Sequence, residues 1–243
     1  MPTPTMRIAA LSDFHIGATA RADQFVHTED GFLAFLDRLE REHDTIVLVG
    51  DVFQAEHGAI PGARAARVQL ERAMQRMPRL VARLGGPRYR YVHGNHDEIA
   101  RAALGAMESV RLAEDGFAAF FVHGHQFDPV FGAAAPLARA STWATGRLRA
   151  LGLRRVPDWL EGVDVAVKHR RFGGLDGPYV TAARKLLRAH SADVVVMGHT
   201  HVPWRLEVPE GVVLGCGTCS GGRRMYVTID MHTHAAELRV EVG

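Results

Sequence analysis

Five apolar runs along the chain are each followed at once by a group of polar side chains. Each run reads as a β-strand, and together they cover Ile8 to Leu11, Ile46 to Val49, Tyr89 to Val92, Phe117 to Val122 and Val194 to Met197. Between the first two runs, apolar side chains return at helical spacing, at Phe32, Phe35, Leu36 and Leu39. A long helix is predicted from about Ala63 to Leu84, where Gly85-Gly86-Pro87 ends it. This βαβαβ alternation is typical of a parallel or mixed sheet with covering helices.

The last third of the chain shows a different pattern, in which short strands are separated by turn residues. The predicted strands are Val202 to Val208, Val212 to Gly215, Met225 to Asp230 and Ala236 to Val242. We expect these strands to form a largely antiparallel sheet that packs against the first sheet. The predicted fold is therefore α/β, a sandwich of two sheets flanked by helices. The length of 243 residues suits a single domain over residues 1–243, and a second domain is not required.

The residues between His125 and Pro178 have no obvious place in this sandwich. The stretch from Phe131 to Leu153 is rich in Ala, Leu and Arg and reads as helix, and a second short helix is predicted at Pro157-Asp158-Trp159-Leu160. We interpret about residues 129–177 as a helical, lid-like insertion within the domain. An insertion of this kind beside a site is often a lid or substrate clamp, and the alternative is a helical hairpin that completes the core.

Composition changes this picture little. Apolar content of 47%, charged content of 23% and a net charge of +2 are those of an ordinary globular protein, and the charge does not by itself indicate nucleic acid binding. Eight arginines against one acid between Arg64 and Arg90 form either a solvated helix face or a rim that faces phosphate. No apolar run is long enough to span a membrane, and no secretory signal is evident. We expect a cytoplasmic location, with peripheral contact to the inner membrane through the insertion as an alternative.

The polar groups after the five runs carry the chemistry. They are Asp13-Phe14-His15, Gly50-Asp51, Gly94-Asn95-His96-Asp97, His123-Gly124-His125 and Gly198-His199-Thr200-His201. Side chains just past the carboxyl ends of strands converge on one edge of an α/β sheet. Carboxylates, imidazoles and one amide oxygen gathered there suit manganese, iron, cobalt, nickel or zinc better than calcium. The sequence therefore predicts a site for two divalent transition-metal ions, with manganese as the first expectation.

Position along the chain suggests a role for several of these residues. Asp51 stands alone after a strand and is the candidate to bridge two cations. Asp13 and His15 alternate along one extended stretch, so both can face one cation. The pair His199 and His201 has the same spacing and can serve one cation or two neighbouring ones. Further ligands are the neutral carbonyl oxygen of Asn95 and the imidazole of His123.

His96 is expected to have a separate duty. It follows a ligand directly, so its side chain should point away from the metals. It can donate a proton to the leaving oxygen of a substrate, with Asp97 orienting its ring. Two cations about 3.5–4 Å apart can hold a bridging hydroxide for in-line attack and clamp the phosphoryl oxygens.

Taken together, these residues resemble the calcineurin-like metallophosphoesterase superfamily. Its pattern of D-x-H, GD, GNH[DE], a His before Gly, and GHxH is present in order, and the resemblance covers about residues 6 to 230. The resemblance implies a four-layer α/β/β/α sandwich of two mixed sheets flanked by helices. It also implies that metal one is held by Asp13, His15, Asp51 and His201, and metal two by Asp51, Asn95, His123 and His199. His96 would be the acid or a transition-state contact. The choice of His123 as ligand comes from the family, and His125 can replace it or lie behind it.

The insertion and the Gly-His-Thr-His ending resemble the UDP-2,3-diacylglucosamine pyrophosphatases, which cleave a lipid A precursor and use a helical lid to hold acyl chains. That family commonly has Arg where this chain has His96, so this motif has the general phosphatase or phosphodiesterase form. The resemblance implies an apolar groove lined by Trp143, Leu148, Leu151, Leu153 and Trp159. Candidate contacts to the phosphoester substrate are Arg64, His125, Arg170 and Arg171, and the basic residues of the insertion, Arg170 and Arg171 among them, are alternatively candidates to meet a membrane surface.

The predicted function is a binuclear metal-dependent phosphoester hydrolase that acts on a nucleotide-sugar or lipid pyrophosphate. A nuclease or cyclic-nucleotide phosphodiesterase would use the same metals, so nucleic acid remains a candidate partner. A protein phosphatase would need an open groove, which the insertion crowds. A non-catalytic binding scaffold is the alternative of another class, although every expected ligand is present.

Overall fold

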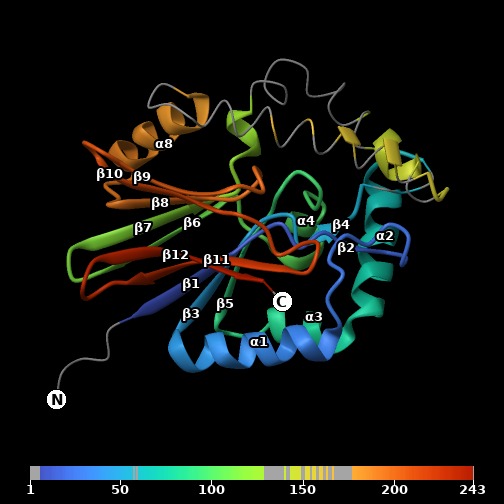
Figure 1. Ribbon diagram of the computed structural model, residues 1–243, viewed down its shortest axis with the longest axis horizontal. Helices are drawn as coiled ribbons and strands as arrows, with labels where there is room; N and C mark the ends of the chain where they lie inside the picture. The colour runs from blue at the N-terminus through green and yellow to red at the C-terminus, as the bar shows by residue number, and fades with distance from the viewer. Residues whose placement is uncertain are drawn as a thin grey trace.

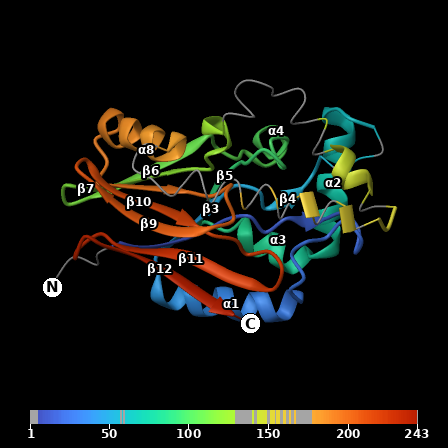
Figure 2. The same ribbon diagram turned by 45° about the horizontal axis from the view of Figure 1, so that its top comes forward.

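A computed structural model of the protein describes residues 6–56, 58, 60–128, 140, 143–148, 151–153, 155, 156, 159, 160, 163, 166 and 177–242. In these residues two five-stranded sheets stack face to face (Figures 1 and 2). Helices α1 and α3 cover the outer face of one sheet and α8 covers the outer face of the other (Figure 1). The predicted α/β/β/α order of layers is therefore confirmed.

The first sheet has the strand order β12-β11-β1-β3-β5 within the described residues. Its strands are β1 (Arg7–Leu11), β3 (Thr45–Val49), β5 (Tyr89–Val92), β11 (Arg223–Asp230) and β12 (Ala235–Val242). As the βαβαβ pattern predicted, β1, β3 and β5 run parallel. β11 pairs antiparallel with β1, and β12 pairs antiparallel with β11.

The second sheet has the strand order β6-β7-β8-β10-β9 within the described residues. Its strands are β6 (Ser109–Glu114), β7 (Phe117–Val122), β8 (Val194–Met197), β9 (Pro203–Val208) and β10 (Gly211–Cys216). β7, β8 and β10 run parallel, and the two outer strands are antiparallel to their neighbours. The prediction that the last four strands share one antiparallel sheet is wrong, because β11 and β12 return to the first sheet. There β11 covers the edge of β1, which would otherwise leave its backbone groups unpaired.

Outside residues 129–177, five α-helices and three short elements complete the described part of the chain. The helices are α1 (Glu29–Glu42), α2 (Ala63–Arg76), α3 (Pro78–Leu84), α4 (Ala100–Leu104) and α8 (Pro178–Ala189). The short elements are the strands β2 (Ile16–Gly17) and β4 (Phe53–Gln54), which pair in parallel, and the 3₁₀ helix η1 (His125–Phe127).

The helix predicted from Ala63 to Leu84 is divided into α2 and α3. Pro78 has no backbone N–H and disfavours a helical conformation in the residue before it, and Met77 accordingly has φ −134° and ψ 62°. The start of α3 is then capped by the Glu29 carboxylate, which accepts from the backbone N–H groups of Arg79 at 2.8 Å and Leu80 at 3.0 Å.

Alternation along the strands distributes the apolar side chains over three clusters. In β1, Ala9 and Leu11 face the helices α1 and α3, whereas Ile8 and Ala10 face the opposite sheet. The middle cluster lies between the sheets, and the third lies between the second sheet and α8, where Tyr179 is buried. Since both faces of β1 are buried, the strand is apolar throughout, as expected for a central strand.

Part of the predicted insertion can be compared with the structure. The described residues 143–148 are helical, as expected. Most other residues of the stretch 129–177 lie outside the described ranges, including the predicted substrate contacts Arg170 and Arg171. Among the helices of the described residues, none is both long enough and apolar enough to cross a membrane.

Candidate metal centre

The candidate ligands lie on loops with an unusual backbone conformation. Of nine non-glycine residues with positive φ in the described part of the chain, five are candidate ligands. They are Asp13 (56°), His15 (55°), Asp51 (53°), His199 (66°) and His201 (57°). Positive φ is unfavourable for residues that carry a Cβ, and strain of this kind concentrates at functional sites. The strand ends therefore hold these side chains in directions that relaxed loops would not adopt.

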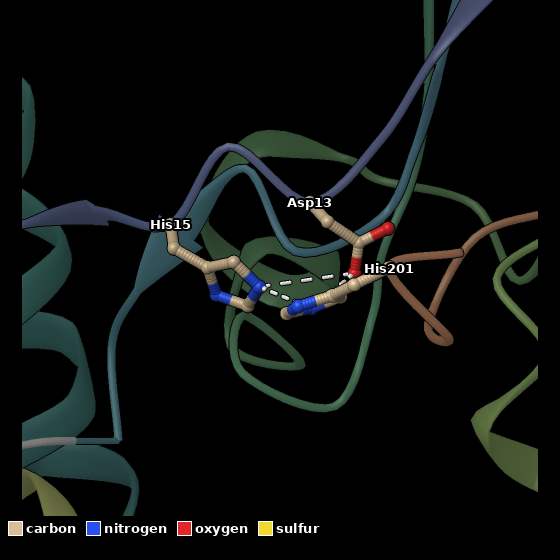
Figure 3. A group of neighbouring side chains, drawn as sticks. All are labelled: Asp13, His15 and His201. Atoms are coloured by element: carbon tan, nitrogen blue, oxygen red, sulfur yellow. Dashed lines mark hydrogen bonds and ion pairs between the residues drawn. The ribbon is translucent and has the colours of Figure 1, made fainter. Parts of the chain in front are cut away.

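The first group of ligand atoms is formed by Asp13, His15 and His201, whose side chains point toward one another (Figure 3). Asp13 Oδ1 lies 3.2 Å from His201 Nε2 and 3.7 Å from His15 Nε2. The two Nε2 atoms lie 3.0 Å apart. Donor atoms that each lie about 2.1 Å from one cation, at right angles, are about 3.0 Å apart, so this spacing suits a shared ion.

A second group is formed by Asp51, His123 and His199. His123 Nε2 lies 3.2 Å from Asp51 Oδ2 and 3.3 Å from Asn95 Oδ1. The other ring nitrogen of His123, Nδ1, donates to the Val49 carbonyl at 2.8 Å. This bond fixes the tautomer in which a neutral His123 presents the Nε2 lone pair to Asp51 and Asn95.

Asp51 joins the two groups, because it also lies in a third group with His15 and His96. Its position between His15 and His123 is the one that the sequence assigned to a bridging carboxylate. The placement of His96 differs from the prediction that its ring points away. The ring of His96 lies edge-on to that of His15, with 4.9 Å between centroids.

The physical reason for the position of His96 is local. Residues 95 and 96 form a bend and are not extended, so side chains do not alternate between opposite faces. The bend closes over Asp51, whose Oδ1 accepts from the backbone N–H of His96 at 2.8 Å.

Asp97 also lies elsewhere than predicted. Its Oδ1 accepts from the Gly94 N–H at 2.7 Å and its Oδ2 accepts from the Val52 N–H at 2.7 Å. The Tyr91 hydroxyl donates to the same Oδ2. These bonds tie the loop of Asp51 to the loop of Asn95. We therefore assign Asp97 to joining the two loops, in place of orienting the ring of His96.

Charge in the site is balanced between carboxylates and imidazoles. Burial acts to raise the pKa of Asp51, but the imidazoles of His123 and His96 outweigh it and hold this pKa well below its ordinary value. Burial likewise acts to raise the pKa of Asp13, and His201 outweighs it, so that pKa is also lowered. Burial lowers the pKa of His123, but the Asp51 carboxylate outweighs it and raises this pKa to about 9. The buried carboxylates thus favour a positive charge beside them. The proton on His123 is such a charge, and a divalent cation can replace it.

Two motif glycines are required by the close approach of ligand side chains. A Cβ on Gly94 would lie 2.1 Å from Asp51 Oδ1. A Cβ on Gly50, whose φ is +86°, would lie 2.3 Å from His123 Nδ1. The ligands therefore pack directly on the backbone of the neighbouring loop, where only glycine leaves room for them.

One residue in contact with the site was missed from the sequence. Asp128 Oδ2 lies 3.2 Å from His199 Nε2 and accepts from the Tyr179 hydroxyl at 2.9 Å. The available signal was a carboxylate five residues after His123, at the end of the same loop. Asp128 directly follows η1, which turns the chain back toward His199.

Of the two remaining substrate candidates, His125 lies beside this centre. His125 begins η1, with its ring centroid 5.4 Å from that of His123 and 6.3 Å from that of His199. Arg64 is exposed in the first turn of α2.

Several arginines of the Arg64–Arg90 run pair with acids and do not form a rim for phosphate. Arg76 contacts Asp23 at 3.1 Å, and Arg83 contacts Glu40 of α1 at 2.6 Å. Arg79 likewise pairs with two acids at the start of α1. These arginines link α2 and α3 to α1 and to the loop before it.

A cavity of about 1110 Å³ opens beside His96. Its walls come from the start of α2, from α4 and from two described residues of the insertion, Ala140 and Trp143. Most of these walls are apolar, and Trp143 is fixed by donation from its Nε1 to the Gly58 carbonyl at 2.9 Å. Trp143 thus lines an apolar space as expected, whereas Leu151, Leu153 and Trp159 are exposed and are not among its lining residues.

We expect the Gly94→Ala variant to bind at least one metal equivalent fewer than the wild-type protein, because the new methyl group displaces the Asp51 carboxylate. The control is Gly85→Ala, since Gly85 has φ −80° and a Cβ there makes only ordinary contacts. Elemental analysis after loading with Mn²⁺ and desalting measures the effect. Equal metal content in Gly94→Ala and the wild type would contradict the prediction.

Comparison with known proteins places the chain in a family. The family model for calcineurin-like phosphoesterases matches residues 6–203, and the search of curated proteins gives no significant match.

Solved structures that match along the chain include a predicted phosphoesterase, a phosphodiesterase and Vps29. A predicted phosphoesterase from Streptococcus pneumoniae shares 16% identity at a TM-score of 0.43, with 98% of this chain and 99% of that chain covered. An archaeal phosphodiesterase shares 15% at 0.46, with 97% and 100% covered. Vps29 from Chaetomium thermophilum shares 11% at 0.48, with 97% and 94% covered. These sequence identities and TM-scores are too low to support an argument about function. The family match over most of the chain, in contrast, is decisive, and the protein belongs to the calcineurin-like phosphoesterase family.

Proposed function

We propose that the protein is a phosphoester hydrolase that uses two divalent metal ions. The observation that carries this proposal is the position of Asp51, whose carboxylate shares one group of ligand atoms with His15 and another with His123. A carboxylate placed between two such groups is suited to bridge two cations.

The residues present fit such a pair of ions. Asp13 Oδ1 is buried and has no hydrogen-bond partner, although two imidazole nitrogens face it. One cation would be held by Asp13, His15, Asp51 and His201, and the other by Asp51, Asn95, His123 and His199. Mixed oxygen and imidazole ligands suit manganese, iron, zinc, cobalt or nickel, and manganese is the metal that we propose first.

Two bound cations would supply a water-derived nucleophile at neutral pH and neutralise charge on the phosphoryl group. The chain's own contribution is to fix these ligands and to provide an acid. His96 is the candidate acid, because it lies beside His15 and Asp51 and is only partly buried. Its ring also lines the cavity, so it stands between the ligand cluster and the space for the rest of a substrate.

The cavity beside His96 supports a substrate whose phosphoryl group carries a bulky apolar part. Its volume of about 1110 Å³ is at the upper end for small-molecule sites, and its walls are mostly apolar. A lipid pyrophosphate or an acylated nucleotide sugar has this character. A nuclease is less well supported, because several arginines of α2 and α3 are engaged with acids of α1 and the loop before it.

Replacing the bridging carboxylate tests the metal-dependent reaction. We expect Asp51→Asn to lose at least about a thousandfold in kcat/KM on a p-nitrophenyl phosphodiester with Mn²⁺, because both ions lose a shared ligand. The matched control is Asp44→Asn, which alters an exposed carboxylate that accepts from the Arg7 N–H. Wild-type turnover by a folded Asp51→Asn variant would reject metal-assisted hydrolysis and favour a non-catalytic scaffold.

The proton-donor role of His96 predicts a dependence on the leaving group. We expect His96→Ala to slow hydrolysis of alkyl esters by about 10²–10⁴-fold, and to slow p-nitrophenyl esters far less, because p-nitrophenolate leaves without a proton. His232→Ala, at an exposed histidine in the turn before β12, serves as the control. Equal losses on both classes of ester would exclude the role.

The cavity predicts a preference for long apolar groups. Across p-nitrophenyl alkyl phosphodiesters, kcat/KM should rise about fourfold for each methylene group that becomes buried, since each contributes about 0.8 kcal/mol. Ala102→Phe narrows the cavity and should flatten this series. Ala103→Phe on the same helix does not line the cavity and should retain the slope. A flat series in the wild-type protein would argue against an apolar substrate, without affecting the metal-dependent mechanism.

A further inference from the structure

A buried chain of hydrogen bonds leads from helix α8 to the candidate metal centre. The Tyr179 hydroxyl donates to Asp128 Oδ2 at 2.9 Å, and the same oxygen lies 3.2 Å from His199 Nε2. All three residues are almost completely buried. The exposed fraction of the side chain is 3% for His199 and 5% for Asp128, and Tyr179 is 1% exposed. A buried carboxylate that receives two donors is well compensated, so the chain is a stable arrangement of charge.

The three residues come from separate elements that the fold brings together. Asp128 follows η1, Tyr179 is the second residue of α8, and His199 follows β8. The ring of Tyr179 packs in the third apolar cluster, between α8 and the second sheet. Its hydroxyl is therefore held in place by the core and fixes Asp128 in turn.

The position of Asp128 determines how His199 can act as a ligand. A carboxylate only accepts hydrogen bonds, so the proton of the imidazole lies on Nε2 and the lone pair lies on Nδ1. His199 belongs to the second group of ligand atoms, with Asp51 and His123. We propose that Asp128 and Tyr179 are positioning residues for the second metal ion, which set the tautomer and ring direction of His199.

The two proposed cations differ in how much negative charge their ligands carry. The first group contains a carboxylate of its own, Asp13, and the cation there would also share Asp51. Among the proposed ligands of the second cation Asp51 alone is negatively charged, since Asn95, His123 and His199 carry no negative charge when they bind a cation. The negative charge of Asp128 acts on the second cation through the ring of His199. The hydrogen bond to Asp128 makes that imidazole a stronger electron-pair donor to the metal.

The inference rests on the proposed binuclear function, and its test measures metal binding directly. Metal-free protein is titrated with Mn²⁺ alone by calorimetry, and the wild type should show two binding events. Asp128→Asn should weaken one of them by about 10–100-fold, and Tyr179→Phe by about tenfold, while the other is unchanged. The visible absorption of the Co²⁺-loaded protein should change for one ion only.

Tyr226→Phe is the matched control, because it removes a comparable bond from a tyrosine to a carboxylate, at Glu241, in the first sheet. It should leave both binding events unchanged. Two Mn²⁺ ions bound with wild-type affinity by Asp128→Asn would overturn the proposal, as would an equal loss at both sites. If Asp128→Asn does not fold, Tyr179→Phe decides by the same criteria. Wild-type protein that binds no Mn²⁺ would contradict the proposed function itself.

Discussion

Two carboxylates shielded from solvent, Asp13 and Asp51, set the conditions for the rest of this structure. Their exposed fractions are 0% and 1%, and an unpaired charge in such a place costs several kcal/mol. The surrounding loops offset that cost with imidazoles and with backbone N–H groups. The backbone N–H of His199 donates to Asp13 Oδ2, and the backbone N–H of His96 donates to Asp51 Oδ1. The ligand geometry is thus the arrangement by which the sheet edge tolerates two buried charges, and it is one that a cation would complete.

This arrangement is maintained by packing beneath the loops. Residues with positive φ cost of order 1–3 kcal/mol each, and five of them carry candidate ligands. Phe14 shows how the strain is held, because it lies between the ligands Asp13 and His15 and is fully buried. Its ring packs on Phe25 and Phe32, with centroids 5.7 Å and 5.2 Å away. Helix α1, which carries Phe32, therefore supports the direction of the first metal-binding loop.

The sequence was informative wherever a local pattern determines the outcome. The end of β1 fixes where Asp13 and His15 lie, and parallel strands bring Asp51 and Asn95 to the same edge. It failed where pairing or bending is decided by distant residues. Nothing near β11 reveals that it pairs with β1, and the bend at His96 depends on the carboxylate of Asp51. Asp128 was missed because its partners, Tyr179 and His199, are more than fifty residues away.

The return of β11 to β1 has a consequence for synthesis on the ribosome. β1 is made first, yet its partner on one side, residues 223–230, emerges only after every ligand loop has been made. Until then the first strand has an open edge, which is a template for pairing with other chains. The loops that follow β1, β3 and β5 therefore gain a complete sheet beneath them only when the hairpin of β11 and β12 docks.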